Sequence, residues 1–270
     1  MRFAICNEIF QGWKIDDVFA HCARLGYDAV EVAPFTLAPH VTDIPAAERA
    51  RIRAAAARAG IAISGIHWVL VQTEGMHLTS PDASTRERTA RYFIDLVDFC
   101  ADLGGDVIVV GSPKQRSLAA GVTREQGWAW MAETFRPSIR RAEERGVTIC
   151  LEPLPEEDTN FINTAAEAVR FAREQASPRF QVILDVRAMS HEATPVPDII
   201  RACRGAFAYV HANDRNLKGP GFGEVDFRPI AAALRETGYD GTVSVEVFRF
   251  EEGPEVIASR SLEHLRKTFS

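Results

Sequence analysis

Four polar residues interrupt or end apolar runs in the second half of the sequence. They are Glu152 in TICLEPL, Asp185 in QVILDV, His211 in AYVHAND and Glu246 in VSVEVF, at successive intervals of 33, 26 and 35 residues. An ionised carboxylate in a Val/Ile-rich run costs free energy unless it is paired, hydrogen-bonded or bound to a metal. Three carboxylates and one imidazole offer mostly hard oxygen ligands. The set therefore suits one divalent cation: Mn²⁺, Mg²⁺ or Co²⁺, with Zn²⁺ as a further candidate.

These residues belong to a regular alternation of short apolar runs and longer amphipathic stretches that fills the sequence. The apolar runs are rich in Val, Ile and Leu, which is typical of strands buried on both faces, as in a parallel sheet. The predicted strands are Arg2–Cys6, Ala29–Val32, Ala62–His67, Asp106–Val110, Thr148–Glu152, Gln181–Asp185, Ala208–His211 and Thr242–Val247. The predicted helices are Ile15–Leu25, Ala46–Ala59, Ser84–Leu103, Arg124–Arg145, Ala165–Glu174, Pro197–Arg204, Phe227–Glu236 and Glu255–Thr268.

This alternation predicts one α/β domain over residues 1–270, a (β/α)8 barrel. An open doubly wound sheet is the alternative, but it would usually carry fewer strands and a glycine fingerprint after the first strand. Here the first strand is followed by NEIFQGW. The C-terminal ends of barrel strands converge on one mouth, which would bring the four polar residues together. The competing interpretation is four independent polar residues, each satisfied by Arg or by backbone.

The composition is that of a globular protein, with 46% hydrophobic and 25% charged residues. Its 31 Lys and Arg against 37 Asp and Glu give a net charge of −6, which disfavours a nucleic-acid partner. Five scattered cysteines without a CxxC pair predict reduced thiols rather than disulfides or a thiolate zinc site. The sequence shows neither a signal peptide nor an apolar stretch near the ~20 residues of a membrane span. We expect a cytoplasmic protein with no membrane partner, and a homo-oligomer is left open.

The strand motifs resemble those of the sugar isomerase/epimerase barrels related to xylose isomerase, the ketose 3-epimerases and the apurinic endonuclease of the same fold. The resemblance spans nearly the whole chain, and the quartet in LEPL, LDV, HAND and VEVF is its most specific part. Asn163-Thr164 and the segment PGFGEVDF from Pro220 to Phe227 support it. The resemblance implies that the quartet binds one divalent ion and that its two glutamates also move protons.

The chemistry of proton transfer next to a carbonyl agrees with this assignment. Removing such a proton requires a base and a means of stabilising the enediolate charge, which a divalent cation on the carbonyl and hydroxyl oxygens provides. Glu152 and Glu246, on the fifth and eighth strands, can face each other across the metal and act as two bases. The sequence therefore predicts a metal-dependent isomerase or epimerase of a small sugar, keto-sugar or polyol.

Six further residues are predicted to bind this small-molecule substrate: Glu8, His67, Gln115, Asp158, Arg215 and Lys218. The first three follow or end the first, third and fourth strands. Asp158 stands where the family has a substrate-contacting carboxylate. Arg215 and Lys218 are the candidates for an Arg that the ketose 3-epimerases place before the Pro-Gly pair.

One departure from the family keeps other functions open. The ketose 3-epimerases commonly have a His three residues after the strand-six Asp, where this sequence has Ala188; His191 is the candidate replacement. A lyase or dehydratase acting on a keto-sugar or cyclitol, with the same metal and base, is therefore the second hypothesis. A phosphodiester hydrolase is disfavoured, since it would need many more histidines at the mouth than His67 and His211. A non-catalytic sugar-binding barrel would not need both glutamates.

Overall fold

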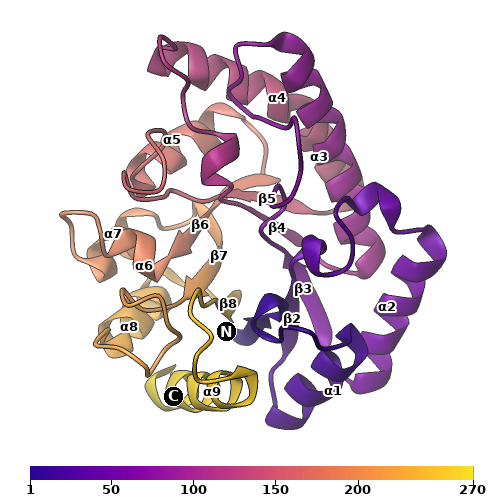
Figure 1. Ribbon diagram of the computed structural model, residues 1–270. Helices are drawn as coiled ribbons and strands as arrows, with labels where there is room; N and C mark the ends of the chain where they lie inside the picture. Colours follow the sequence, from indigo (N-terminus) through magenta and orange to yellow (C-terminus); the bar gives the residue numbers. More distant parts are fainter. Residues whose placement is uncertain (270) are drawn as a thin grey trace.

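The eight strands of the computed structural model, which describes residues 1–269, form one closed parallel barrel (Figure 1). Each strand pairs with the next along the chain, and β1 pairs with β8 to close the barrel. The strands are β1 (Arg2–Cys6), β2 (Ala29–Val32), β3 (Ala62–Ile66), β4 (Val107–Val110), β5 (Thr148–Leu151), β6 (Phe180–Asp185), β7 (Phe207–Ala212) and β8 (Thr242–Val245). The predicted (β/α)8 barrel is confirmed.

The helices form a layer around the barrel (Figure 1). They are α1 (Ile15–Leu25), α2 (Ala46–Ala59), α3 (Ala83–Leu103), α4 (Arg124–Arg145), α5 (Ala165–Glu174), α6 (Val186–Met189), α7 (Val196–Ala202), α8 (Phe227–Thr237) and α9 (Pro254–Phe269). The one-turn helix α6 was not predicted. It forms because the Asp185 carboxylate accepts a hydrogen bond from the Ala188 N–H at 2.6 Å and caps the turn. Helix α1 ends at Gly26, whose φ of +93° is the left-handed conformation that favours glycine.

Apolar side chains fill two regions of the molecule. The larger lies between the strands and the surrounding helices, with residues such as Ile5 and Phe93 fully buried. The smaller lies inside the barrel and includes Val109, Ile183 and Tyr209. The Tyr209 hydroxyl lies 2.7 Å from the Ser64 hydroxyl, so β7 and β3 meet across the interior. This packed interior supports the polar residues at the ends of the strands.

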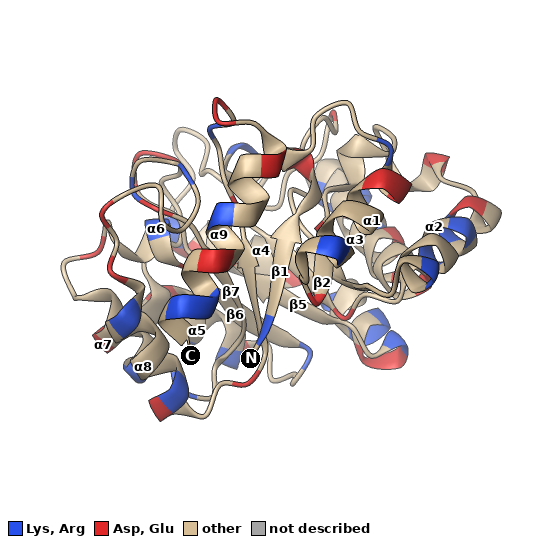
Figure 2. Cartoon of the chain, turned by 90° about the horizontal axis from the view of Figure 1, so that it is seen from below, with Lys and Arg blue, Asp and Glu red and all other residues tan. Residues whose placement is uncertain are grey.

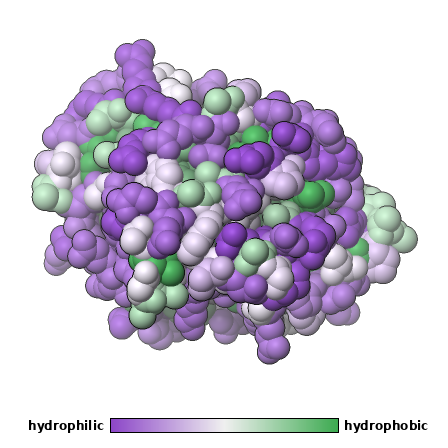
Figure 3. Space-filling model, turned by 90° about the horizontal axis from the view of Figure 1, so that it is seen from above, coloured by the Kyte–Doolittle hydropathy of each residue, from purple (hydrophilic) through white to green (hydrophobic). Residues whose placement is uncertain are grey.

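The outer surface carries both signs of charge. Lys and Arg are intermixed with Asp and Glu over the helices (Figure 2), in keeping with the net charge of −6. The face shown in Figure 3 is largely hydrophilic, with hydrophobic residues in small separate areas. Among the described residues, no helix combines the length and apolar character needed to cross a bilayer.

Candidate metal centre and active site

The four strand-end residues singled out in the sequence lie together at the mouth of the barrel. Asp185 ends β6 and His211 lies on β7, while Glu152 and Glu246 come directly after β5 and β8. One ligand atom from each lies within 4.8 Å of the others, and all four side chains are buried. The barrel thus converts four distant sequence positions into one compact set of oxygen and nitrogen donors.

The electrostatics of this cluster favour a bound cation. Burial, reinforced by Asp185 and Glu246, raises the pKa of Glu152 well above its usual range. Burial and Glu246 also raise the pKa of Asp185, to about 6. Burial acts on Glu246 as well, but the His211 imidazole outweighs it and lowers the pKa of that carboxyl. Three buried carboxylates thus share one imidazole, and a divalent cation would supply the missing positive charge.

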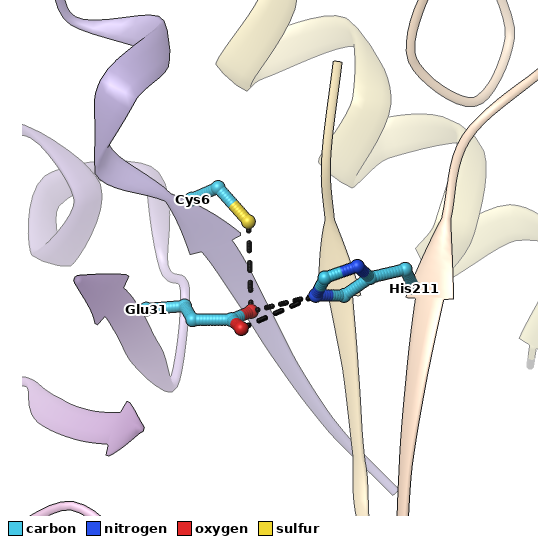
Figure 4. A group of neighbouring side chains, drawn as sticks. All are labelled: Cys6, Glu31 and His211. Carbon is cyan, nitrogen blue, oxygen red and sulfur yellow. Dashed lines mark hydrogen bonds and ion pairs between the residues drawn. The ribbon is translucent and has the colours of Figure 1, made fainter. Parts of the chain in front are cut away.

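The hydrogen bonds of His211 indicate which ring nitrogen would face the metal. Its Nε2 lies 3.1 and 3.2 Å from the two carboxylate oxygens of Glu31 on β2 (Figure 4). Its buried Nδ1 makes no hydrogen bond among the described residues, although it lies 3.1 Å from Oε2 of Glu246. A carboxylate behind a metal-binding imidazole fixes the ring and leaves the other nitrogen free for the metal. The donor set therefore fits the predicted divalent ion, with Nδ1 of His211 as its nitrogen ligand.

Glu31 is a functional residue that the sequence interpretation missed. Its side chain is fully buried and also accepts a hydrogen bond from Cys6 Sγ at 3.5 Å (Figure 4). A further hydrogen bond comes from Tyr209 Oη at 3.1 Å. Burial alone would raise its pKa, but His211 and His67 outweigh burial and lower that pKa to about 2. The available signal was a Glu within the apolar strand AVEV, the same kind of signal that identified Glu152 and Glu246.

Glu31 also connects the cluster to two of the predicted substrate-binding residues. His67 Nδ1 lies 3.5 Å from Oε1 of Glu31, and His67 Nε2 lies 2.8 Å from Oε2 of Glu8. Carboxylates and imidazoles therefore alternate from Glu8 through His67 and Glu31 to His211. His67 is fully buried beneath the mouth, so the structure places it behind the site rather than on its surface.

The backbone of Glu152 is held by a buried guanidinium. The Arg116 side chain is fully buried and donates hydrogen bonds to the carbonyl oxygens of Glu152, at 2.5 Å, and Ile162, at 3.2 Å. Its neighbour Gln115 reaches the mouth instead. These two hydrogen bonds from the buried Arg116 hold the loop that carries Glu152 in place.

A cavity of about 650 Å³ opens directly beside the cluster. Its lining includes Glu152, Asp185 and Glu246, together with Gln115 and Asp158 from the predicted substrate-binding set. The volume lies within the range of small-molecule sites. Two of the six predicted substrate residues are therefore brought to the cavity that adjoins the candidate metal centre.

The structure does not bring the predicted basic residues to this cavity. Arg215 is exposed and Lys218 forms an ion pair with Glu252, and neither lines the cavity. His191, the candidate for the position left open by Ala188, lies 3.7 Å from Glu157 and is also outside the lining.

Arg187 is a cationic residue of the cavity lining that the sequence interpretation did not predict. It lines the cavity, donates to Asp158 at 2.9 Å, and lies 5.6 Å from the centre of the Phe248 ring. The sequence interpretation missed it because the loop after Asp185 was read for a histidine. An Arg only two residues after a predicted ligand was the available signal.

Two stacked aromatic residues, Trp68 and Phe248, line this cavity. Trp68 lies between Phe35 and Phe248, with ring centres 5.8 and 6.0 Å away and planes 26° and 25° apart. The Trp68 indole N–H donates to Oε1 of Glu246 at 2.9 Å. Its φ of +53° is left-handed, which is rare for a bulky residue and concentrates at functional sites. Trp68 therefore orients the carboxylate of Glu246.

Residues 19–268 match the family model described as the xylose isomerase-like TIM barrel. The chain belongs to this family. The predicted family is thereby confirmed. Among curated relatives, the D-psicose 3-epimerase of Ruminiclostridium cellulolyticum is 29% identical over 88% of this chain and 80% of its own. The 3-dehydro-D-guloside 4-epimerase of Escherichia coli is 23% identical over 98% and 99%.

Solved structures show the same fold. The crystal structure of D-psicose 3-epimerase from Clostridium cellulolyticum with D-tagatose has a TM-score of 0.89, with 22% identity and full coverage of both chains. The 3-keto-D-glucoside 4-epimerase of E. coli in its apo form has a TM-score of 0.86, with 23% identity over 99% of both chains. At these identities the structural likeness supports the barrel fold alone.

Proposed function

We propose that this chain is a divalent-metal-dependent epimerase that removes and returns a proton next to the carbonyl of a keto-sugar. The curated relatives are sugar 3- and 4-epimerases over most of the chain, which confirms the predicted sugar epimerase class. The observation that carries the proposal for this site is the juxtaposition of Glu152 and Glu246 in one buried cluster with Asp185 and His211. This arrangement offers two proton-transfer groups beside one cation site.

The residues have separate roles in this proposal. Glu152, Asp185, His211 and Glu246 would hold the ion, which supplies positive charge to stabilise negative charge on the substrate oxygens. Glu152 and Glu246 take and return the proton at the carbon next to the carbonyl. Trp68 keeps the Glu246 carboxylate oriented by its 2.9 Å hydrogen bond.

The cavity lining suits a small hydroxylated substrate. The lining combines polar groups of Gln115, Asp158 and Arg187 with the apolar side chains of Phe248 and Leu217. We favour Mn²⁺ because three carboxylates suit a hard ion and the fourth donor, the His211 imidazole, suits a transition-metal ion better than Mg²⁺. The five cysteines are unpaired and buried, which supports the predicted reducing, cytoplasmic compartment.

A lyase or dehydratase is the second candidate, and one observation favours it. Ala188 is buried and contributes only its backbone N–H to Asp185, so this chain lacks the polarising histidine expected there. In an elimination, one glutamate would act as the base and the other chiefly as a ligand.

Proton exchange distinguishes these functions. The purified protein is incubated with Mn²⁺ and a panel of ketoses, inositols and keto-glycosides in D₂O. An epimerase incorporates deuterium at the carbon next to the carbonyl and interconverts epimers, whereas a lyase yields a dehydrated product. Absence of exchange and of product with every compound, while Mn²⁺ is bound, would contradict both enzymatic proposals.

A further inference from the structure

A second cavity opens at the same mouth, next to the one beside the metal cluster. Its volume is about 580 Å³, and its walls come from the segments that follow β1, β2 and β3, from the start of α1, and from Phe250 after β8. Trp68 and Gln72 line both cavities, so they form the wall that the two cavities share. Each volume lies within the ~300–1,000 Å³ typical of small-molecule sites. One molecule with two parts could therefore occupy both cavities.

The floor of the second cavity contains a buried carboxylate with one oxygen unused. Glu8 lines the cavity and is 5% exposed. His67 holds its Oε2 at 2.8 Å, whereas the buried Oε1 has no hydrogen-bond partner among the described residues. A buried acceptor left unpaired costs free energy, and a hydroxyl donor from a ligand would recover it. Because Glu8 already faces an imidazole, a neutral hydroxyl suits its free oxygen better than a second cation.

The walls around Glu8 provide the apolar surface that a sugar ring requires. Phe10, Trp13 and Phe250 line the cavity, and the rings of Phe10 and Trp13 are in contact, with centres 5.4 Å apart. Trp13 is half-buried, and its indole N–H makes no hydrogen bond among the described residues. Aromatic faces with a few directed polar groups bind rings that have both apolar C–H faces and hydroxyl edges.

We infer that the second cavity binds a second sugar ring, so that the preferred substrate is a glycoside of a keto-sugar rather than a free monosaccharide. The keto-sugar ring lies beside the metal cluster, and a hydroxyl of the attached ring donates to Oε1 of Glu8. This inference rests on the proposed epimerase function. It assigns Glu8, predicted from the sequence to bind substrate, to the attached ring rather than to the reacting one.

Two readouts test this inference. The first compares kcat/KM for proton exchange, with Mn²⁺ present, between free ketohexoses and a 3-keto-disaccharide carrying a second glucose ring. The second measures binding of methyl glucoside to the metal-free protein by saturation-transfer NMR, which does not depend on catalysis. The variants are Glu8→Gln and, since Glu8 is buried, the half-buried Trp13→Leu. Glu263→Gln, on the exposed side of α9, is the matched control.

We expect the wild type to have a higher kcat/KM for the disaccharide than for the free ketohexoses. In Glu8→Gln the ratio of these two kcat/KM values should fall about 10- to 100-fold, the effect of losing one hydrogen bond to a charged group. The loss of exchange with the disaccharide should exceed any loss with the free ketose by that factor, and methyl glucoside binding should weaken in both variants but not in Glu263→Gln. Equal rates for both substrates in the wild type, or equal losses for both in Glu8→Gln, would overturn the inference. If methyl glucoside binds through Glu8 but no compound exchanges its proton, the sugar site stands and the epimerase proposal fails.

Discussion

The two sides of the barrel mouth contain the same residue types in different proportions. On the β1–β3 side, two carboxylates, Glu8 and Glu31, alternate with His67 and end at His211 of β7. On the β5–β8 side, three carboxylates surround His211 alone. On the β1–β3 side, imidazole contacts offset the negative charge of the buried carboxylates. On the β5–β8 side, one imidazole is too few for three carboxylates.

His211 joins the two sides, with Nε2 facing Glu31 and Nδ1 facing Glu246. The comparison teaches that a buried carboxylate on a barrel strand does not by itself indicate a metal site. The balance of carboxylates and imidazoles around it decides whether a cation is needed. The predictions below alter that balance on one side or the other.

The largest effect is expected from removing a metal ligand on the β5–β8 side. Asp185→Asn or His211→Ala should abolish tight Mn²⁺ binding, because each removes one of only four donors. Titration calorimetry measures the affinity, and circular dichroism checks that the barrel remains folded. The exposed Asp240→Asn is the matched control. Wild-type affinity in Asp185→Asn would show that the cluster is not the metal site.

The next effect concerns the two proposed bases. Glu152→Gln and Glu246→Gln keep the shape of the side chain but remove its basicity, so turnover should fall by roughly 10² to 10⁴. Each variant should lose exchange of the substrate proton on its own face, measured from each epimer in D₂O. Unequal effects without interconversion of epimers would favour the lyase. Near-full activity in either variant with metal bound would show that the substituted glutamate is a metal ligand and not a base.

Without metal, the β5–β8 side should destabilise the protein as the pH rises. Because the pKa of Asp185 is raised from 3.8 to about 6, the folded state holds this proton more tightly than the unfolded chain. The stabilising effect is complete below about pH 4 and is lost as the pH rises through 6. For Asp185 it amounts to about 3 kcal/mol, and the raised pKa of Glu152 acts in the same direction.

Urea unfolding of the metal-free protein between pH 4 and 7 measures this decline. Saturating Mn²⁺ should remove it, since the bound cation stabilises the ionised carboxylates. Asp185→Asn should make the decline of the metal-free protein smaller, because one of the two titrating groups, Asp185 and Glu152, is gone. A metal-free stability that rises across this range would be inconsistent with uncompensated carboxylates on this side.

The smallest effect comes from the self-compensated side. Glu31→Gln keeps an acceptor for His211 but removes the charge behind the ring, so Mn²⁺ affinity should weaken about tenfold. Tyr209→Phe is the matched control, since it removes one hydrogen bond to Glu31 and leaves the charge in place. A smaller change in Glu31→Gln than in Tyr209→Phe would show that Glu31 has no influence on the metal through His211.

The alternation of strands and helices could be predicted because each strand is a short apolar run buried on both faces. The structure differs mainly where strands leave the sheet. β5 ends at Leu151 and β8 at Val245, so Glu152 and Glu246 lie just past the hydrogen-bonded ladder. Their direction toward the mouth, but not the strand boundary, could be inferred from sequence. Helix α6 is a single turn of four residues, too short to show a helical period.

The metal cluster could be predicted because consecutive strands of a barrel bring their ends together. The contacts that pass across the barrel could not, since they depend on register and side-chain reach. Glu31 and His211 lie 180 residues apart, and Trp68 and Glu246 lie 178 apart. No local pattern links either pair. Arg187 is different, because it lies only two residues after Asp185 and a local signal for it was present.

The closure of the barrel has a consequence for the order of events when the chain is made. β1 pairs with β8 in a register that runs from Arg2 opposite Thr242 to Ile5 opposite Val245. During translation, the first strand therefore gains its second neighbour only after β8 has been made, about 240 residues later. Pairing of such distant segments is slow because the loop must close first. Since Glu246 follows β8 directly, the four-residue cluster is complete only once β8 has paired with β1 and closed the barrel.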